Sequence, residues 1–283
     1  MTTLIIGGSG FLGTELLRRA RAAGHTTAAT YATKPGSAPQ ARWHSLDLTK
    51  ASRLDEVMAE VRPRLVINVS SSKDDWRVTA QGPIRIAMAA ARYGSRFIHV
   101  SSDAVFSGAH VQYDESSLPD PLTPYGAAKA AAETGVLTVY PEAAVARTSL
   151  IIGHGRSVHE RVVHELAAGA EGALYTDDVR CPVYVEDLAA ALLELAQSDA
   201  TGIQHLAGAD AVSRHELGTL IARRDGLDPS RLRAGLRAQS TLPGALDVRL
   251  DSRATQAKLR TTLRGARQFC TEPHTASQAT DPR

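Results

Sequence analysis

Tyr125 and Lys129 stand four residues apart in a stretch that is typical of an α-helix. Residues 127–137 are rich in strong helix formers, and Pro124 sits where a first helical turn tolerates proline. On a helix, side chains at i and i+4 lie on one face, one above the other. A phenol can donate a proton, and a neighbouring ammonium group stabilises the phenolate left behind. Because such pairs also arise by chance on helix surfaces, their chemistry depends on what lies beside them.

Three regularly spaced glycines, Gly7, Gly10 and Gly13, follow an apolar run over residues 3–6 that predicts a buried parallel strand. A helical pattern then covers residues 11–23. Glycine in such a loop lets the backbone approach a pyrophosphate, which rests on the positive end of the helix. Between a predicted strand and a predicted helix, the motif indicates a dinucleotide site.

A second apolar strand, predicted over residues 96–100, ends in Ser101, Ser102 and Asp103, shortly before Tyr125. A serine hydroxyl beside a tyrosine can hydrogen-bond the same carbonyl oxygen. Because side chains alternate along a strand, only one of the two serines can face the site. A phosphate cradle, a hydroxyl pair and a Tyr/Lys pair, in this order, indicate a nicotinamide-dependent carbonyl reductase.

The choice of cofactor depends on the second predicted strand, residues 25–30, which ends without the carboxylate that would grip the ribose 2′-hydroxyl of NAD. Lys34, beyond it, could meet the 2′-phosphate of NADP, although a loop lysine is more often solvated. We therefore expect NADPH, with NADH as the alternative. Asp47 closes the third strand, residues 43–46, where it could bond the adenine ring or cap the helix over residues 52–61.

Strand and helix patterns alternate with short connections in the first half of the chain, which indicates a doubly wound parallel sheet. Strands are predicted over residues 3–6, 25–30, 43–46, 65–69, 96–100 and 143–148, and helices over residues 11–23, 52–61, 78–93 and 127–137. Beyond them, helices are predicted over residues 157–168, 185–196 and 213–223, with short strands near Leu174 and Gln204. The fold class is therefore α/β, a doubly wound parallel Rossmann sheet with a smaller C-terminal α/β substrate-binding lobe.

The expected domain organisation follows this change in pattern. An NADP-binding Rossmann domain covers residues 1–152, and residues 183–206 return to it. The substrate-binding lobe comprises residues 153–182 and 207–270. Residues 271–283 are polar and unpatterned, so we expect a disordered tail.

The composition of the 283 residues, 43% hydrophobic and 22% charged, is ordinary for a globular protein. A net charge of +2, with no long run of Lys or Arg, gives no case for nucleic-acid binding. No apolar run approaches the ~20 residues that cross a bilayer, and no signal peptide is recognisable. Cys181 and Cys270 are too few and too far apart for a disulfide framework, which predicts a cytoplasmic protein.

Histidines at 154, 159 and 164 raise the question of a metal site, because His159-Glu160 is similar to the start of a zinc-protease motif. That motif needs its second histidine at i+4, whereas His164 is at i+5 and turned off the first one's face. We expect solvated or partly packed histidines and no metal site.

With these residues assembled, the chain resembles the extended short-chain dehydrogenase/reductase family. Within it, the likeness is closest to the dTDP-4-dehydrorhamnose reductases and their sugar-nucleotide-binding relatives, and it runs from residue 1 to about residue 269. The matching segments, in order, are residues 7–13, 46–49, 66–68, 101–108, 124–129, 147–150, 180–189 and 205–208.

The resemblance implies roles for these residues. Tyr125 would donate a proton to the carbonyl oxygen while hydride arrives from the nicotinamide, and Lys129 would stabilise the phenolate and hold the ribose. Ser102 occupies the family's Ser/Thr position, with Ser101 as the alternative. Expected cofactor-binding residues are Gly7, Gly10, Phe11, Leu12, Gly13, Tyr31, Lys34, Asp47, Leu48, Ser70, Ser71, Tyr125 and Lys129. Expected substrate-binding residues are Asp103, Val105, Arg147, Ser149 and Arg180, the last suited to bidentate phosphate recognition.

The chain departs from the family pattern in three places. Ser70 to Trp76 replaces an Ala-Tyr-Thr-like stretch, Ala104 replaces an aromatic residue, and Thr79 replaces an asparagine through which a proton relay would run. We expect NADPH-dependent reduction of a keto group on a nucleotide-activated deoxysugar, in a protein that could form a homodimer. The alternatives are reduction of another small ketone, or a non-catalytic NADP-binding subunit similar to the methionine adenosyltransferase beta subunit.

Overall fold

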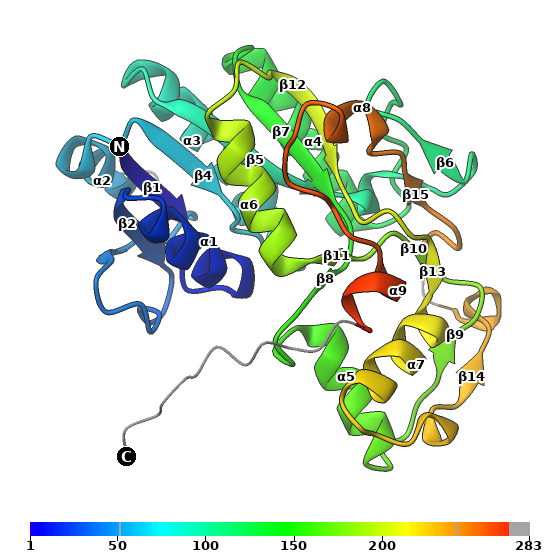
Figure 1. Cartoon of the computed structure of the whole chain (residues 1–283). Coiled ribbons are helices and arrows are strands. Elements are labelled where there is room, and N and C mark those ends of the chain that lie inside the picture. Colours follow the sequence, from blue (N-terminus) through cyan, green and yellow to red (C-terminus); the bar gives the residue numbers. More distant parts are fainter. Residues whose placement is uncertain (51, 242, 272–283) are drawn as a thin grey trace.

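A seven-stranded, wholly parallel sheet forms the centre of the protein in a computed structural model, which describes residues 1–50, 52–241 and 243–271 (Figure 1). Its strands in spatial order are β12 (Gly202–Leu206), β7 (Ala144–Thr148), β5 (Arg96–Ser102), β4 (Leu65–Asn68), β1 (Thr2–Ile6), β2 (Thr26–Tyr31) and β3 (Arg42–Ser45). The doubly wound α/β sheet that the sequence predicts is therefore confirmed. The expected tail, residues 271–283, lies outside the described residues from residue 272 onward.

The order of the strands reverses between β1 and β4. From β1 the chain adds β2 and β3 on one side, and it then returns to place β4, β5, β7 and β12 on the other. The loops after β1 and β4 consequently run in opposite directions and leave a crevice at the carboxyl ends of these strands, where ligands of this architecture bind.

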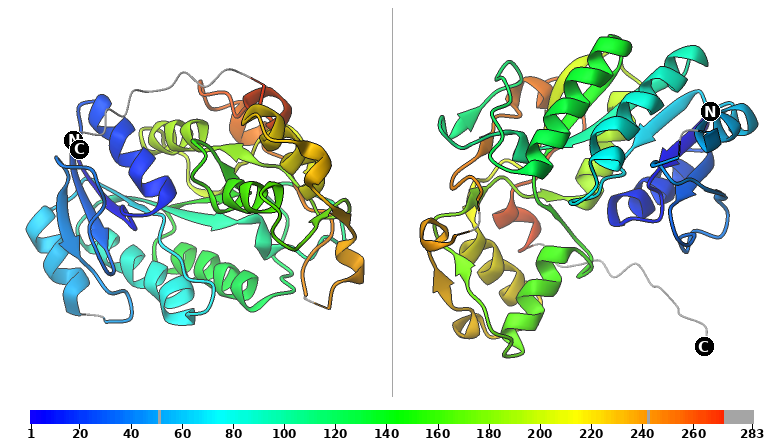
Figure 2. Two further views of the ribbon diagram at one scale, coloured as in Figure 1. Left: turned by 90° about the horizontal axis from the view of Figure 1, so that it is seen from below. Right: turned by 180° about the vertical axis from the view of Figure 1, so that it is seen from behind.

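Helices cover both faces of the sheet (Figure 2). Helices α1 (Phe11–Ala22) and α6 (Val185–Ala196) lie on one face, and α2 (Ser52–Val61), α3 (Gly82–Arg92) and α4 (Pro124–Val139) lie on the other. Alternate residues of each strand pack against the helices on opposite faces of the sheet. In β1, Ile5 packs with α1 and α6, whereas Leu4 and Ile6 pack with the helices on the other face.

A smaller lobe beyond the carboxyl edge of the sheet contains α5 (Val158–Ala167), α7 (Arg214–Arg224) and α9 (Ala266–Phe269). It has a core of its own, built from residues that include Val163, Leu217 and Ile221. The short strand pairs are β6 (Gln112–Tyr113) with β15 (Arg249–Leu250), β8 (Ile151–Ile152) with β11 (Val183–Tyr184), β9 (Leu174–Tyr175) with β14 (Ala234–Gly235), and β10 (Val179–Arg180) with β13 (Val212–Ser213). A short helix, α8 (Arg253–Gln256), packs near β12. The domain boundaries given above stay a prediction.

One predicted helix begins differently from the expectation. In place of a continuous α-helix over residues 78–93, a π-helical turn, η1 (Arg77–Gln81), precedes α3. Pro83 has no N–H, so the carbonyls of the preceding turn cannot all be paired in the normal i→i−4 pattern. The turn widens instead, and the Gly82 N–H donates to the Arg77 carbonyl.

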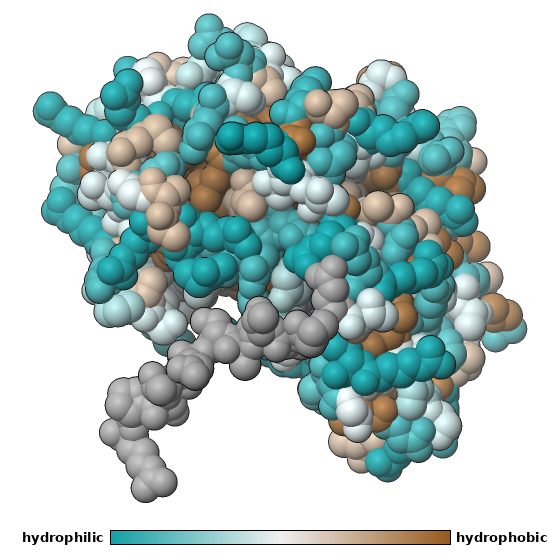
Figure 3. Space-filling model, viewed as in Figure 1, coloured by the Kyte–Doolittle hydropathy of each residue, from teal (hydrophilic) through white to brown (hydrophobic). Residues whose placement is uncertain are grey.

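The face of the molecule seen in Figure 3 is mostly hydrophilic, with apolar residues in small separate patches. Within the described residues, every helix is too short or too polar to cross a membrane.

Candidate active site

The crevice at the strand reversal is a cavity of about 370 Å³. The glycine loop forms one wall. Gly7 has a φ of +84°, and a Cβ there would lie 2.9 Å from the Ser70 nitrogen. A Cβ at Gly13 would lie 2.4 Å from the Gly7 carbonyl oxygen, so the loop folds tightly only because both residues are glycine. Gly10 is the N-cap of α1, which directs the positive end of that helix at the cavity.

Seven of the expected cofactor-binding residues line this cavity: Gly7, Gly10, Tyr31, Asp47, Leu48, Ser70 and Ser71. Leu12 and Gly13 are buried behind it, and Phe11 packs against the core. Lys34 is exposed and is not among the lining residues. Sequence reasoning missed the further lining residues Ile6, Ser9, Thr30, Ala32, Leu46, Val69 and Val78.

Thr30 is the missed residue with the clearest role. Its hydroxyl accepts a hydrogen bond of 3.1 Å from the Gly7 N–H and so fixes the glycine loop. The sequence could have indicated this role, because Thr30 lies near the end of β2, the strand that pairs with β1.

Asp47 closes a turn. Its carboxylate accepts hydrogen bonds from the Thr49 hydroxyl at 2.7 Å and the Thr49 N–H at 2.9 Å. These bonds lower the pKa of Asp47 below its ordinary value. A bond to an adenine ring stays a prediction.

Tyr125 and Lys129 lie in the first turns of α4. Thr123 is the N-cap, and its hydroxyl accepts from the Gly126 N–H at 3.0 Å. The Lys129 side chain is buried, and its Nζ lies 6.0 Å from the centre of the Tyr125 ring. Nζ donates a hydrogen bond of 2.9 Å to the Val100 carbonyl of β5. Burial lowers the pKa of Lys129 to about 8, although the nearby Glu133 carboxylate acts in the opposite direction.

The Tyr125 phenol is surrounded by hydroxyl groups and one carboxylate. Burial raises its pKa, and so does the charge of Asp103. Hydrogen bonds with the Ser71 and Ser102 side chains lower the pKa. The raised pKa keeps the phenol protonated near neutral pH.

The structure separates the two candidate serines. Ser101 is buried and donates a hydrogen bond of 2.5 Å to Glu133, behind the site. Ser102 lies beside Tyr125 and donates to Asp103 at 3.2 Å. The geometry thus favours Ser102 as the hydroxyl that faces a substrate.

Three expected substrate-binding residues meet at one carboxylate. Asp103 accepts from the Ser149 hydroxyl at 2.6 Å, and Arg180 Nε lies 3.8 Å from the same oxygen. Arg180 Nη1 in turn lies 2.9 Å from Asp178. These contacts connect Ser102 with the lobe.

Arg147 and Val105 lie elsewhere. Arg147 is 2% exposed, pairs with Glu133 at 2.8 Å and stacks 4.9 Å above the Phe106 ring. Val105 is wholly buried in the same region. Both support the site from behind, and direct contact with substrate stays a prediction for them.

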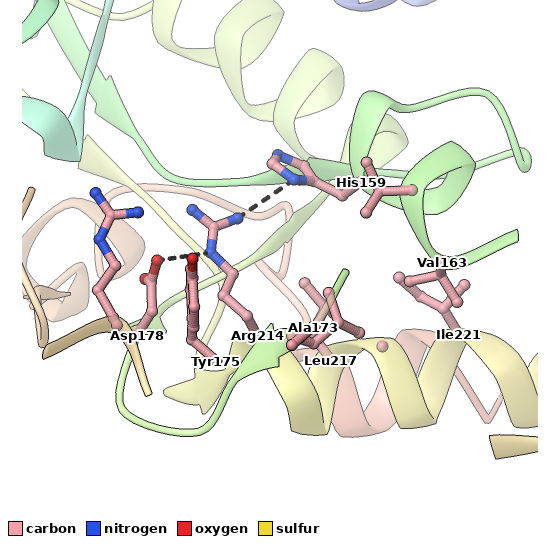
Figure 4. Close-up of a pocket in the computed structure, with 12 residues that line it drawn as sticks. His159, Val163, Ala173, Tyr175, Asp178, Arg214, Leu217 and Ile221 are labelled. Atoms are coloured by element: carbon pink, nitrogen blue, oxygen red, sulfur yellow. Dashed lines mark hydrogen bonds and ion pairs between the residues drawn. The ribbon is translucent and has the colours of Figure 1, made fainter. Parts of the chain in front are cut away.

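The lobe contains a second cavity, of about 220 Å³ (Figure 4). Its wall combines apolar side chains with charged groups: Val162, Val163, Ala173, Leu174, Leu217, Gly218 and Ile221, with His159, Tyr175, Asp178, Arg214 and Arg237. Sequence reasoning missed this cavity, because its charged residues come from segments that are far apart along the chain.

Arg214 stands in the middle of the charged wall, between Asp178 at 3.4 Å and His159 at 3.3 Å (Figure 4). Burial lowers the pKa of His159 to about 3, so that ring is neutral and Arg214 remains the local charge. Arg237 lies over the Tyr175 ring, and within the described part of the chain its buried Nε has no hydrogen-bond partner. An anion in this cavity would therefore meet guanidinium groups.

The described residues contain no group of three or more histidine, cysteine or acidic side chains that could hold a metal ion. His164 pairs with Asp225 at 2.7 Å on the outer side of α5.

A protein-family model described as "RmlD substrate binding domain" matches residues 1–271. The chain belongs to this family. The resemblance to dTDP-4-dehydrorhamnose reductases that the sequence shows is thereby confirmed.

Individual relatives and solved structures that are similar to this chain are named dTDP-4-dehydrorhamnose reductases. The dTDP-4-dehydrorhamnose reductase of Mycobacterium tuberculosis strain CDC 1551 is 38% identical over 177 residues, a match that covers 59% of this chain and spans 58% of that protein. The structure of a hypothetical dTDP-4-dehydrorhamnose reductase from Sulfolobus tokodaii is similar with a TM-score of 0.80 and 27% identity, covering 93% of this chain and 97% of the other. The Bacillus anthracis dTDP-4-dehydrorhamnose reductase, solved in complex with NADP, shares the fold with a TM-score of 0.79 at 19% identity, covering 95% and 96%.

Proposed function

We propose that this protein is an NADPH-dependent oxidoreductase that reduces a keto group on a nucleotide-activated deoxysugar, as a 4-ketoreductase similar to dTDP-4-dehydrorhamnose reductase. The observation that carries the proposal is that the groups beside Tyr125 lead to both cavities. Its neighbour Ser71 lines the cavity at the strand reversal. Its neighbour Asp103 connects through Arg180 to Asp178, in the wall of the lobe cavity.

The cavity at the strand reversal fits a nicotinamide dinucleotide. The tight glycine loop brings backbone N–H groups and the positive end of α1 to its wall, which suits a pyrophosphate. When bound, the nicotinamide supplies a hydride to the carbonyl carbon. NADPH is favoured because β2 ends without a carboxylate, and the related Bacillus anthracis structure contains NADP. NADH remains the alternative.

Two side chains of this chain would act on the carbonyl oxygen, and a third would stabilise the phenolate. Tyr125 donates its proton to that oxygen, and Ser102 donates a hydrogen bond to it. The charge of Lys129 stabilises the resulting phenolate across a short, buried distance, where electrostatic interactions are stronger than in water.

The lobe cavity suits the nucleotide part of a substrate. Its apolar wall can accept a flat base, and the guanidinium groups of Arg214 and Arg237 can pair with phosphate oxygens. The names of the relatives point to a dTDP-linked sugar.

The test is NADPH oxidation with a panel of dTDP-, UDP- and GDP-linked ketosugars and free small ketones. We expect turnover with a nucleotide-linked ketosugar, abolished by Tyr125→Phe. Tyr140→Phe is the matched control, because Tyr140 lies at the far end of α4 and donates to the Ser95 carbonyl. Turnover with free ketones alone would favour a reductase of secondary metabolism. No turnover, together with a stable complex with another enzyme, would favour a regulatory subunit.

A further inference from the structure

Arg214 is held on two sides in the wall of the lobe cavity (Figure 4). Its Nε lies 3.4 Å from a carboxylate oxygen of Asp178, and its Nη1 lies 3.3 Å from Nδ1 of His159. Within the part of the chain that the structure describes, its Nη2 has no hydrogen-bond or ion-pair partner. Because a guanidinium group is planar, fixing two of its nitrogens also sets the direction of the third.

Backbone pairing keeps Asp178 beside Arg214. Strands β10 and β13 are antiparallel, with Val179 opposite Ser213, and the Arg214 N–H donates to the Asp178 carbonyl at 2.9 Å. The Asp178 side chain is buried, and its other carboxylate oxygen lies 2.9 Å from Arg180 Nη1. Both carboxylate oxygens therefore face guanidinium groups.

The contact with His159 depends on the protonation of the imidazole ring. Burial lowers the pKa of His159 to about 3, the charges of Arg214 and Lys73 act in the same direction, and the charge of Glu160 opposes them. A neutral imidazole has one donor nitrogen and one acceptor nitrogen, and a guanidinium group can only donate. Nδ1 is therefore the acceptor, and the ring proton lies on Nε2.

The N-terminal ends of two helices meet at this contact. His159 lies in the first turn of α5, which the capping box of Ser157 and Glu160 stabilises, and Arg214 is the first residue of α7. The positive ends of both helices favour an anion. Glu160 is buried, pairs with Arg224 at 2.7 Å and is not among the residues that line the cavity. Its charge is therefore compensated away from the cavity wall.

We propose that His159 is a positioning residue of the lobe cavity, which accepts from Nη1 of Arg214 and thereby directs Nη2 of Arg214 to an anionic group of the ligand. This inference rests on the proposed function, in which that group is a phosphate of the nucleotide. Nη2 donates to the phosphate, while Asp178 and His159 keep their contacts with Nε and Nη1. A ligand without an anionic group, such as a free ketone, gains nothing from this arrangement.

The state of the His159 ring can be measured without any ligand. Proton–nitrogen correlation spectra are recorded on protein with isotope-labelled histidine, and the signals of His159 are assigned by their loss in His159→Phe. Between about pH 5 and 8, where an ordinary histidine titrates, we expect a neutral ring with its proton on Nε2. Arg214→Met should shift the Nδ1 signal. A ring that is charged in this range, or that carries its proton on Nδ1, would overturn the proposal, whatever the protein's substrate.

Calorimetric titrations with dTDP and with inorganic pyrophosphate test the consequence for binding. His159→Phe keeps a ring but removes the acceptor, so it should weaken the binding of dTDP on the order of tenfold. His159→Asn should restore most of the affinity, because its side-chain oxygen can take the place of Nδ1. NADPH binding should be unchanged in both variants.

His164→Phe is the matched control, because His164 belongs to the same helix and pairs with Asp225 on its outer side. It should bind dTDP as the wild type does. Wild-type dTDP affinity in a folded His159→Phe would refute the positioning role, and so would a His159→Asn that binds no better than His159→Phe.

The two probes distinguish a failure of this role from a failure of the proposed function. Binding of pyrophosphate that depends on His159, without binding of dTDP, would support the positioning role and contradict a nucleotide ligand. Binding of neither probe to the wild type would overturn the anion site itself. With a substrate, His159→Phe should raise KM and leave kcat nearly unchanged. A lower kcat at an unchanged KM would contradict a role in binding.

Discussion

Arg147 and Glu133 form an ion pair of 2.8 Å in which the two side chains are only 2% and 3% exposed. Glu133 lies one helical turn beyond Lys129, so the carboxylate is part of the electrostatic surroundings of that lysine. It also accepts the hydrogen bond from Ser101 at the end of β5. The pair therefore joins α4, β5 and β7 directly behind the candidate active site.

Breaking this pair on one side should be strongly destabilising. Glu133→Gln or Arg147→Met should each lower the free energy of unfolding by about 3–5 kcal/mol, because the remaining charge is buried without its partner. The double variant should lose much less than the sum of the two. Denaturant unfolding of all four proteins gives the coupling, and additive losses would show that the pair contributes no mutual stabilisation.

The burial of Lys129 predicts a specific pH dependence of stability. Its pKa of about 8 in the folded protein lies below the value of 10.5 for an exposed lysine. Between these values the unfolded chain binds more protons than the native protein, so this group's contribution to stability rises with pH. The free energy of unfolding of the wild type relative to Lys129→Met should therefore increase from pH 8 toward 10. A difference that stays constant over this range would show that Lys129 is not desolvated.

Two glycines of the phosphate loop should respond differently to alanine. At Gly10 φ is −78° and a Cβ would lie 3.3 Å from the Gly7 carbonyl oxygen, so Gly10→Ala should fold and lose cofactor affinity. At Gly13 the corresponding distance is 2.4 Å, and Gly13→Ala should also lower the melting temperature. Calorimetric titration with NADPH and thermal unfolding separate the two effects. Full NADPH affinity in Gly10→Ala would contradict the placement of the pyrophosphate.

Arg237 should contribute to nucleotide binding in the lobe. Arg237 lines the lobe cavity, and within the described residues its buried Nε has no hydrogen-bond partner, so a phosphate there could supply the acceptor. Arg237→Ala should weaken the binding of dTDP by roughly tenfold, as expected for a hydrogen bond to a charged group, and leave NADPH binding unchanged. Arg233→Ala is the control, because Arg233 is exposed in the same segment and is not among the residues that line the cavity. Equal losses in the two variants would indicate only a general charge effect.

The sequence predicts the sheet well because parallel strands buried on both faces are nearly continuous apolar runs, as in residues 65–68. Glycine spacing likewise reveals the phosphate loop, since backbone geometry there tolerates no side chain. These are local signals, which can be recognised in the sequence without knowledge of the tertiary structure.

Other features depend on contacts between distant segments and were not predictable in this way. Arg147 matches the family at a position expected to touch substrate, but only the fold shows that Glu133 binds it behind the site. The lobe cavity brings His159, Tyr175 and Arg214 together from α5, β9 and α7.

The most direct test of the proposed activity is the transfer of deuterium from NADPH labelled at C4 of the nicotinamide to a dTDP-linked 4-ketosugar, followed by mass spectrometry and NMR of the sugar. We predict that the wild-type protein places deuterium on the carbon that was the carbonyl, and that Tyr125→Phe does not. A sugar without deuterium after incubation with folded, NADPH-bound wild-type protein would contradict the proposed reductase activity on this substrate. Equal transfer of deuterium by Tyr125→Phe would contradict the proposed role of the tyrosine.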